Sequence, residues 1–238
     1  MPDLAYLDQL FATKRRLETE GESTAWLAGR LKELRAWQAA RLARTYDDLL
    51  RDPSCQAAVE FFLTDLYGPQ DFAQRDADLT RAWERLKRGL PAAALEVVAP
   101  ALELQVLSAE LDQAMVARLG DKAVTEPSYA EAYRAVGRSD ARRRQIDLVV
   151  SIGNDLQRLV KFPLIGLALR AARIPAHLAG FGVLQNFLER GFAAFRQLGD
   201  ARMLLDAIRE RETALLQALF NGSEEPFRPH QSMGARGV

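Results

Sequence analysis

Polar and aromatic side chains that could do chemistry are concentrated in two neighbouring segments of the chain, residues 41–48 and 61–76. Arginines, tyrosines and aspartates in this density can build a hydrogen-bonded network, and the Gly68-Pro69 corner would hold it rigid. A polar cluster of this kind beside apolar helices is typical of a small-molecule pocket. The predicted ligand-binding residues are Arg44, Tyr46, Asp65, Tyr67, Arg75, Asp76 and His177.

A structural interpretation of the same segments stays open. Arg44 and Asp48 are four residues apart and could pair along one helix, and Asp71 is placed to cap the next helix. The aromatic side chains would then belong to the core. Because structural ion-pair networks perturb charges as readily as active sites do, we assign no catalytic residue.

His177 lies on an apolar segment and could serve as an axial haem ligand or a metal ligand, with nearby phenylalanines as pocket walls. No second histidine or Glu-x-x-His pair accompanies it, and His230 belongs to the C-terminal segment. The single cysteine, Cys55, excludes a disulfide within the chain and a cysteine-based zinc cluster. We therefore expect no metal and no cofactor, and a core or boundary role for His177.

The common catalytic motifs are missing from the sequence. It holds no phosphate-binding G-x-x-x-x-G-K-[ST] loop, no G-x-G-x-x-G fingerprint, no G-x-S-x-G elbow and no H-E-x-x-H pair. Lysines and arginines balance aspartates and glutamates at 32 each, so no global field attracts nucleic acid. Without a basic recognition helix, we expect no specific nucleic-acid binding.

Helical periodicity and helix punctuation run along nearly the whole chain. Apolar residues recur at spacings of three and four over residues 26–50, 90–119 and 175–198, and Pro100 should kink or divide the second of these helices. The pattern predicts an all-α fold: a single compact multi-helix domain of about eight to ten helices with orthogonal or bundle-like packing. We place the domain at residues 1–222 and a flexible tail at 223–238.

Two charged patterns fall within these predicted helices. Glu96, Glu103 and Glu110 are spaced by seven, which puts three carboxylates on one face and is typical of a solvated side. The run Arg142 to Arg144 lies in the first turns of its helix, where cations oppose the helix dipole. Such a run needs acidic neighbours or marks an anion site, and we favour solvated or salt-bridged arginines.

The most apolar stretch, Leu159 to Leu184, is interrupted by Lys161 and Arg170 and broken by Pro163 and Pro175. Burying such charges in a bilayer would cost a few kcal/mol each, so we expect core here and no transmembrane segment. The N-terminus has early acidic residues and no apolar signal-peptide region. A cytoplasmic location is the expectation.

Small residues accumulate on one side of the predicted helix 175–198. Ala176, Gly180 and Gly191 would let a partner helix approach closely, within the chain or across a homodimer.

Three segments in order, FFLTDLYGPQDFAQRD, YAEAYRAVGR and HLAGFGVLQNFLERGFAAFR, resemble an uncharacterised family of bacterial, mainly proteobacterial, helical proteins of about this length. The resemblance spans most of the chain. It implies a cytoplasmic all-α protein, and it carries over no activity, cofactor or catalytic residue.

Two functional hypotheses remain. The leading one is a non-catalytic binding or interaction module, self-assembling as a homodimer through the small-residue side of helix 175–198. The alternative is a protein or enzyme that binds a small molecule or a hydrophobic ligand in a pocket between helices. A ligand retained by the purified protein would favour the second hypothesis, and a partner or a dimer would favour the first.

Overall fold

The computed structural model describes residues 4–66, 73–86 and 92–228, and within these ranges every regular element is a helix. The all-α prediction is confirmed. Eleven α-helices and one π-helical turn make up the described part, slightly more than expected.

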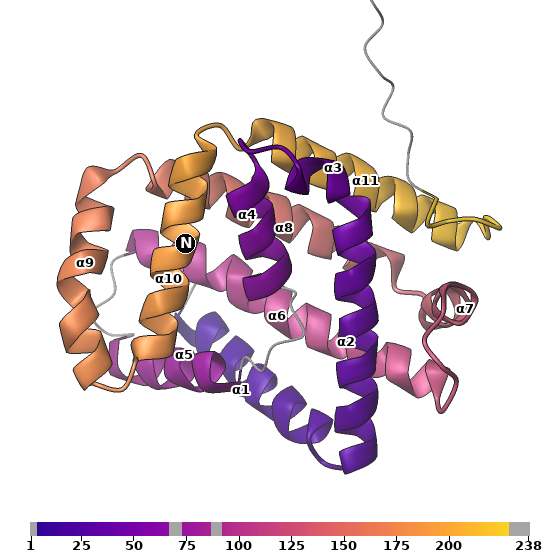
Figure 1. Cartoon of the computed structure of the whole chain (residues 1–238). Helices are drawn as coiled ribbons and strands as arrows, with labels where there is room; N and C mark the ends of the chain where they lie inside the picture. The colour runs from indigo at the N-terminus through magenta and orange to yellow at the C-terminus, as the bar shows by residue number, and fades with distance from the viewer. Residues whose placement is uncertain (1–3, 67–72, 87–91, 229–238) are drawn as a thin grey trace, which may run out of the picture.

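Four of the long helices lie side by side in the order α11, α8, α6, α1. In Figure 1 this row lies behind the other helices and runs across them. Their bounds are α1 (Leu4–Gly21), α6 (Ala92–Leu119), α8 (Ser139–Leu159) and α11 (Arg202–Phe220). In front of this row stand the upright helices α2 (Ala25–Thr45), α4 (Gln56–Phe61), α10 (Gly182–Leu198) and α9 (Pro163–Leu178).

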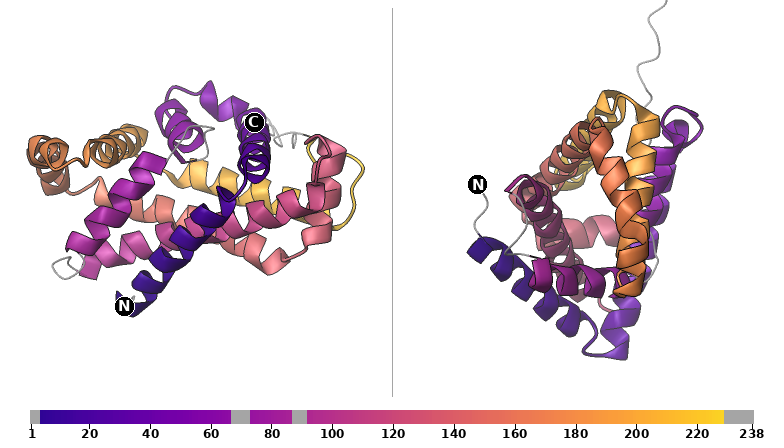
Figure 2. Two further views of the ribbon diagram at one scale, coloured as in Figure 1. Left: turned by 90° about the horizontal axis from the view of Figure 1, so that it is seen from below. Right: turned by 90° about the vertical axis from the view of Figure 1, so that its left-hand side faces the viewer.

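Short elements close the two ends of the molecule. The α3 turn (Asp47–Leu50) joins α2 to α4, and the π-helical turn η1 (Phe62–Leu66) continues α4. Helix α5 (Ala73–Leu86) packs under α10, and α7 (Glu126–Val136) packs against α6 and α11 at the opposite end. Figure 2 shows the α9–α10 pair projecting at one end of the molecule.

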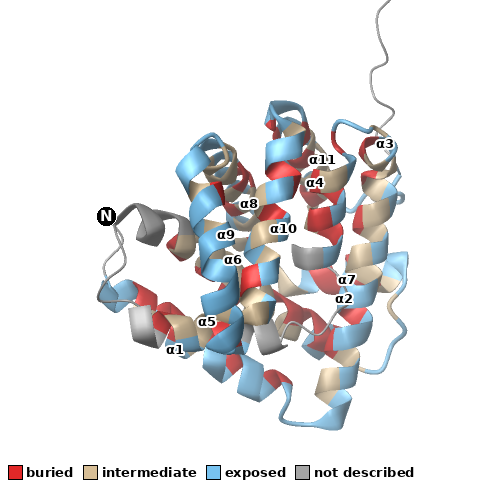
Figure 3. Ribbon diagram, turned by 60° about the vertical axis from the view of Figure 1, so that its left-hand side comes forward, coloured by how far each residue is buried: buried red, intermediate tan, exposed pale blue. Residues whose placement is uncertain are grey.

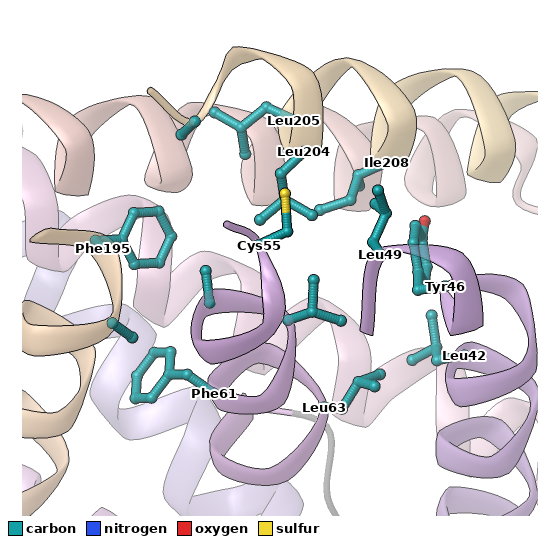
Figure 4. Packing of buried hydrophobic residues seen from close by; sticks show 14 of the residues in the cluster. Leu42, Tyr46, Leu49, Cys55, Phe61, Leu63, Phe195, Leu204, Leu205 and Ile208 are labelled. Atoms are coloured by element: carbon teal, nitrogen blue, oxygen red, sulfur yellow. The ribbon is translucent and has the colours of Figure 1, made fainter. Parts of the chain in front are cut away.

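Three groups of buried side chains hold these helices together. The largest lies between α2–α4, α8, α10 and α11 and includes Tyr46, Cys55, Phe61 and Leu205 (Figure 4). A second joins α2, α6, α7 and α11, and a third joins α1, α5 and α6, where Phe11 stacks on Trp83 with ring centroids 5.1 Å apart.

Threonine side chains cap the starts of two helices. The Thr24 hydroxyl accepts a hydrogen bond from the Leu27 amide at the start of α2. At α7 the Thr125 side chain accepts from the Ser128 amide, and the Ser128 hydroxyl accepts from the Thr125 amide in a capping box. In both cases an otherwise unpaired amide of the first turn is satisfied.

Two predicted boundaries were wrong. The helix expected over 26–50 ends at Thr45, and Asp47–Leu50 forms the separate α3. The helix expected to begin at Pro175 begins at Gly182, because Pro175 lies inside α9 and the chain reverses at Gly180, whose φ is +79°. Pro100 was expected to kink or divide its helix, and it lies inside one continuous α6, so it does not divide it.

The predicted tail begins close to the second core. Phe227 packs edge-on against Trp37, with ring centroids 5.4 Å apart. Residues 229–238 and the Gly68-Pro69 corner lie outside the described residues.

Candidate interaction surface

Helix α9 stands at the edge of the molecule and is covered mainly on one side, by α10. Figure 3 shows it pale blue, that is exposed, along most of its length, whereas the neighbouring α10 alternates between exposed and buried residues. An edge helix of this kind can present a whole face to a partner.

The side of α9 that contacts α10 is defined by three positions spaced by three and four residues. A Cβ atom at Gly166 would lie 3.0 Å from a ring carbon of Phe192, so the two helices are in close contact there. The Leu169 carbonyl accepts a hydrogen bond from Gln185 Nε2 at 2.7 Å. One turn further on, Arg173 pairs with Glu189, with Nε 2.9 Å from Oε1 and Nη2 2.5 Å from Oε2.

The opposite side of α9 is apolar and open to solvent. Leu164, Leu167, Ile174 and Leu178 have exposed fractions of 75%, 57%, 71% and 84%. With Ala171, which is also exposed, they are spaced by three and four residues in turn, so they form one continuous stripe. We call these five residues the α9 stripe.

The α9 stripe is large for a surface feature. From their exposed fractions, its four large side chains present on the order of 500 Å² of apolar surface. The largest apolar patch on a typical monomer is about 300–600 Å² and is often a binding site, and the stripe falls within this range. Phe162, the N-cap residue of α9, is also exposed, at 59%.

The segment that carries the stripe holds more cations than anions. Helix α9 carries no acidic residue, and residues 161–198 carry five lysines and arginines against one acid, Glu189, a net charge of +4. The Arg173 guanidinium lowers the pKa of the Glu189 carboxyl to about 2, with a smaller contribution from Gln185. The stripe itself is uncharged, and the segment that carries it has a positive net charge.

The turn between α9 and α10 is fastened to the rest of the molecule. Arg81 of α5 donates to the Gly180 carbonyl at 3.1 Å, and its guanidinium lies over the Phe181 ring, 5.6 Å from the centroid. Arg81 also pairs with the buried Asp78 at 2.5 Å. These contacts fix the orientation of the α9–α10 hairpin, and with it the direction in which the stripe faces.

Three of the seven predicted ligand-binding side chains fall within the described part of the chain. Arg44 is exposed and pairs with Glu126 of α7 at 3.3 Å rather than with Asp48. Tyr46 is buried, and His177 is exposed on α9, where its Nε2 lies 3.3 Å from Asn186 Oδ1. Helices α2 and α9 lie at opposite sides of the molecule (Figure 1), so His177 does not meet the other two.

The remaining predicted residues cannot be placed beside them, because Tyr67 and the side chains of Asp65, Arg75 and Asp76 lie outside the described residues. Ligand binding by this set stays a prediction. Where the chain is described, no group of histidine, cysteine, aspartate and glutamate side chains is arranged to hold a metal ion.

Tyr46 belongs to a polar network that joins α2 and α3 to α11. Its hydroxyl donates to Glu212 Oε1 at 3.0 Å, and Arg41 donates to the same oxygen at 2.5 Å. Arg211 lies over the Tyr46 ring and forms two hydrogen bonds with Asp48, at 2.7 and 2.6 Å. Burial, reinforced by the Glu212 charge, raises the pKa of Tyr46 well above its usual range.

Tyr46, at the centre of this network, is packed inside the protein, whereas Asp48 at its edge is exposed. Tyr46 is 1% exposed, and its ring lies in the largest core group (Figure 4). The sequence pointed to Tyr46 but missed Arg211 and Glu212, because they lie 165 and 166 residues further along on a helix with ordinary amphipathic spacing. The contacts of Tyr46 fit a role in stability.

Two open hollows lie elsewhere on the described surface. One, of about 630 Å³, is lined by polar residues of the end of α8 and the start of α11, including Asn154, Arg158 and Lys161. Its cations have acidic neighbours, since Arg158 pairs with Asp155, and Arg202 with Asp200. The other, smaller hollow lies between α6 and α7. Neither is an apolar, enclosed site for a ligand.

The prediction that residues 159–184 form core was wrong for α9. Gly166 and Arg173 turn toward α10, and the leucines and the isoleucine of the stripe face outward. The sequence carried a signal for this arrangement: an uninterrupted 3-4-3-4 apolar spacing from Leu164 to Leu178, which is typical of helix–helix seams. Among the described helices, none has the length and apolar character to cross a bilayer.

The glutamates spaced by seven and the arginine run, both noted in the sequence, are joined by a salt bridge between α6 and α8. Glu103 of α6 binds Arg144 of α8 through two hydrogen bonds, at 2.7 and 2.8 Å, and Glu110 pairs with Arg138 at 3.1 Å. The salt-bridged interpretation of the arginine run therefore holds for Arg144. The side chain of Glu96 lies outside the described residues.

Comparison with known proteins gives a family and no activity. The family model described as "Domain of unknown function (DUF8198)" matches residues 18–226, which is most of the chain and includes α9 and α10. The chain matches no curated protein and no solved structure.

Proposed function

Because this chain belongs to the DUF8198 family, whose description assigns no activity, we propose its role from its own surface: it is a binding module that recognises a protein partner through the α9 stripe. The observation that carries the proposal is the exposure of Leu164, Leu167, Ile174 and Leu178 on one face of an edge helix. Apolar surface of this extent is stabilised when a partner removes it from water.

The neighbourhood of the stripe supports this role. The hairpin that carries it is held by Arg173–Glu189 on one side and by Arg81 at the turn, so a partner would meet a preformed surface. Preformed surfaces bind with a lower entropic cost than surfaces that must first become ordered. The positive net charge of residues 161–198 would add selectivity through charge.

Self-association is one form that this binding can take. The small residues proposed from the sequence as a dimer face are used differently: Gly191 lies against Phe61 within the chain, and Gly180 forms the turn. The open stripe offers a surface for the same purpose. A cytoplasmic location, in keeping with the buried, free Cys55, is part of the proposal.

The test compares two variants that each place a carboxylate on an exposed apolar residue. Leu167→Glu changes the stripe, and Met203→Glu changes α11 at a residue of similar exposure, 51% against 57%. Each purified protein is immobilised and passed through bacterial extract, the source implied by the sequence resemblance, and bound proteins are identified by mass spectrometry. The same samples are examined for self-association by sedimentation.

We expect Leu167→Glu to lose a bound protein, another copy of the chain included, that the wild type and Met203→Glu retain, because a buried unpaired carboxylate opposes binding. Thermal unfolding checks that both variants fold, which their exposure leads us to expect. If the three proteins have the same bound partners and the same sedimentation behaviour, the proposal is wrong.

A further inference from the structure

We infer that the partner of the α9 stripe is the stripe of a second copy, and that two α9 helices pair antiparallel across a two-fold axis at Ala171. This inference rests on the proposed function and adds to it the identity of the partner and the geometry of the contact.

The order of side chains along the stripe is nearly the same in both directions from Ala171. Leu164 and Leu178 lie seven residues before and after it, and Leu167 and Ile174 lie four before and three after. A two-fold interface must use the same patch on both subunits, so each residue needs a partner that its own helix also supplies. In the antiparallel pair, Leu164 of one copy meets Leu178 of the other.

The small residue at the centre permits close contact. Packed helices lie about 8–10 Å apart, with the shorter distances reached where the contacting side chains are small. Ala171 is exposed at the midpoint of the stripe, with the larger leucines and isoleucine on either side. Two such helices can therefore approach at the centre while their larger side chains interlock toward the ends.

The apolar area of the stripe is large enough for a dimer interface. Each stripe presents on the order of 500 Å² from its four large side chains, so a pair would bury about 1,000 Å² before flanking residues are included. Specific protein interfaces begin at about this total. Ala171 would add to it.

The position of α9 in the fold also suits a second helix. Helices α4, α10 and α9 stand side by side, and this row ends at α9 (Figures 1 and 2). The stripe lies on the side of α9 away from α10, so an α9 helix from another copy would continue the row. Arg170 lies beside the stripe, where its long side chain can reach solvent around the contact.

Charge distinguishes a second copy from other occupants. Each α9–α10 hairpin (residues 163–198) carries four arginines against Glu189, a net charge of +3, so two hairpins repel, and added salt screens that repulsion. The dimer is therefore expected to tighten as salt is raised from about 0.05 to about 0.5 M. An acidic protein or an anionic membrane would bind more weakly over the same range.

The first measurement is sedimentation equilibrium of the full chain between about 1 and about 100 µM, at both salt concentrations. We expect a dimer in the wild type and in Met203→Glu, and a dissociation constant about 100-fold weaker or more in Leu167→Glu. A wild type that stays monomeric at the highest concentration overturns the inference.

The second measurement locates the contact. In Ala171→Cys, diamide should oxidise the two thiols of a dimer to an intermolecular disulfide, because the two-fold axis brings them together. Ala193→Cys, at an exposed position on α10 outside the stripe, is the control and should stay uncrosslinked, as should wild-type Cys55, which is buried. A dimer that persists in Leu167→Glu and does not cross-link at Ala171 shows that a different face is used and refutes the inference.

A third measurement separates this inference from the proposed function. If the wild type is monomeric yet captures another protein that Leu167→Glu loses, the stripe is a binding surface with a different partner, and only the second-copy inference fails. Vesicles with about 30% phosphatidylglycerol test the remaining occupant. Binding of the monomeric wild type to these vesicles, with no binding by Leu167→Glu, would assign the stripe to a membrane and overturn both proposals.

Discussion

The ring of Phe61 on α4 lies against the backbone of Gly191 on α10, so that a Cβ atom at residue 191 would sit 2.8 Å from the ring Cζ. Phe61 is 5% exposed and has little room to move. This contact sets the spacing between α4 and α10, and α10 in turn supports α9 and its stripe.

Gly191→Ala should therefore destabilise the protein. Overpacking of a tight core contact costs about 1–3 kcal/mol, which exceeds the gain of up to about 1 kcal/mol that alanine brings to a helix interior. Gly29 of α2 is the matched control, because nothing lies within 4 Å of a Cβ atom placed there. Denaturant unfolding should show Gly29→Ala as more stable than wild type, and stabilisation by Gly191→Ala would contradict the packing described.

The buried tyrosines predict how stability depends on alkaline pH. Burial raises the pKa of Tyr46 and the pKa of Tyr133 above the ordinary tyrosine value of 10.0. Above pH 10 the unfolded chain loses these phenolic protons while the folded protein keeps them, so the free energy of unfolding falls as pH rises. Each group contributes up to about 1.4 kcal/mol per pH unit.

Tyr46→Phe should reduce the fall of the free energy of unfolding above pH 10. It should also cost about 1 kcal/mol at neutral pH, because the hydrogen bond to Glu212 is lost. Unfolding by urea at pH 8 to 11 measures both effects. Tyr6→Phe serves as the comparison, since Tyr6 is 41% exposed and should change the slope less. Parallel pH profiles for wild type and Tyr46→Phe would refute the assignment.

Two arginines of one sequence run, Arg142 and Arg144, should respond very differently to replacement. Arg142 is 6% exposed, with its guanidinium 4.4 Å from the centroid of the Tyr133 ring, and its Nε and Nη2 have no hydrogen-bond partner among the described residues. Arg144 is half exposed and binds Glu103. Truncating Arg142 empties buried space, whereas truncating Arg144 breaks a surface pair.

We expect Arg142→Ala to cost about 2 kcal/mol and Arg144→Ala less than about 1 kcal/mol. Arg142→Met, which keeps much of the volume, should be less damaging than Arg142→Ala, because the charge forms few hydrogen bonds. Chemical denaturation of the three variants ranks these costs. Equal losses for Arg142→Ala and Arg144→Ala would mean that burial does not separate the two side chains.

These arginines also show what the sequence could and could not predict. Their position in the first turns of a helix was predictable, since capping residues and apolar spacing are local signals. Which of them turns inward was not, because Tyr133 and Glu103 are supplied by other helices. The same limit applies to Tyr46, whose partners Glu212 and Arg211 come from α11.

The α9 stripe shows a different limit. Apolar residues at helical spacing predict a buried face, and Leu164 to Leu178 follow that spacing without interruption. What the sequence could not show is that α10 lies on the side of Gly166 and Arg173, because that depends on the turn at Gly180 and on the Glu189 contact. Periodicity identifies an apolar face but does not identify what covers it.

The Arg173–Glu189 pair gives a prediction that reports directly on how the hairpin is held. Arg173 lowers the pKa of Glu189 to about 2, so Arg173→Ala should raise that pKa toward the ordinary value of 4.5. The ionised Glu189 carboxyl stabilises the folded hairpin above the pKa that this group has in the unfolded chain. This stabilisation is lost as pH falls toward 2. Carboxyl-carbon NMR of labelled glutamate measures the titration.

Arg170→Ala is the control, because Arg170 lies beside the stripe and is not a partner of Glu189. The titration of Glu189 in this variant should match wild type. A Glu189 pKa that is the same in Arg173→Ala and wild type would mean that α9 is not docked on α10 through this pair, and the outward direction of the stripe would then lose its main electrostatic support.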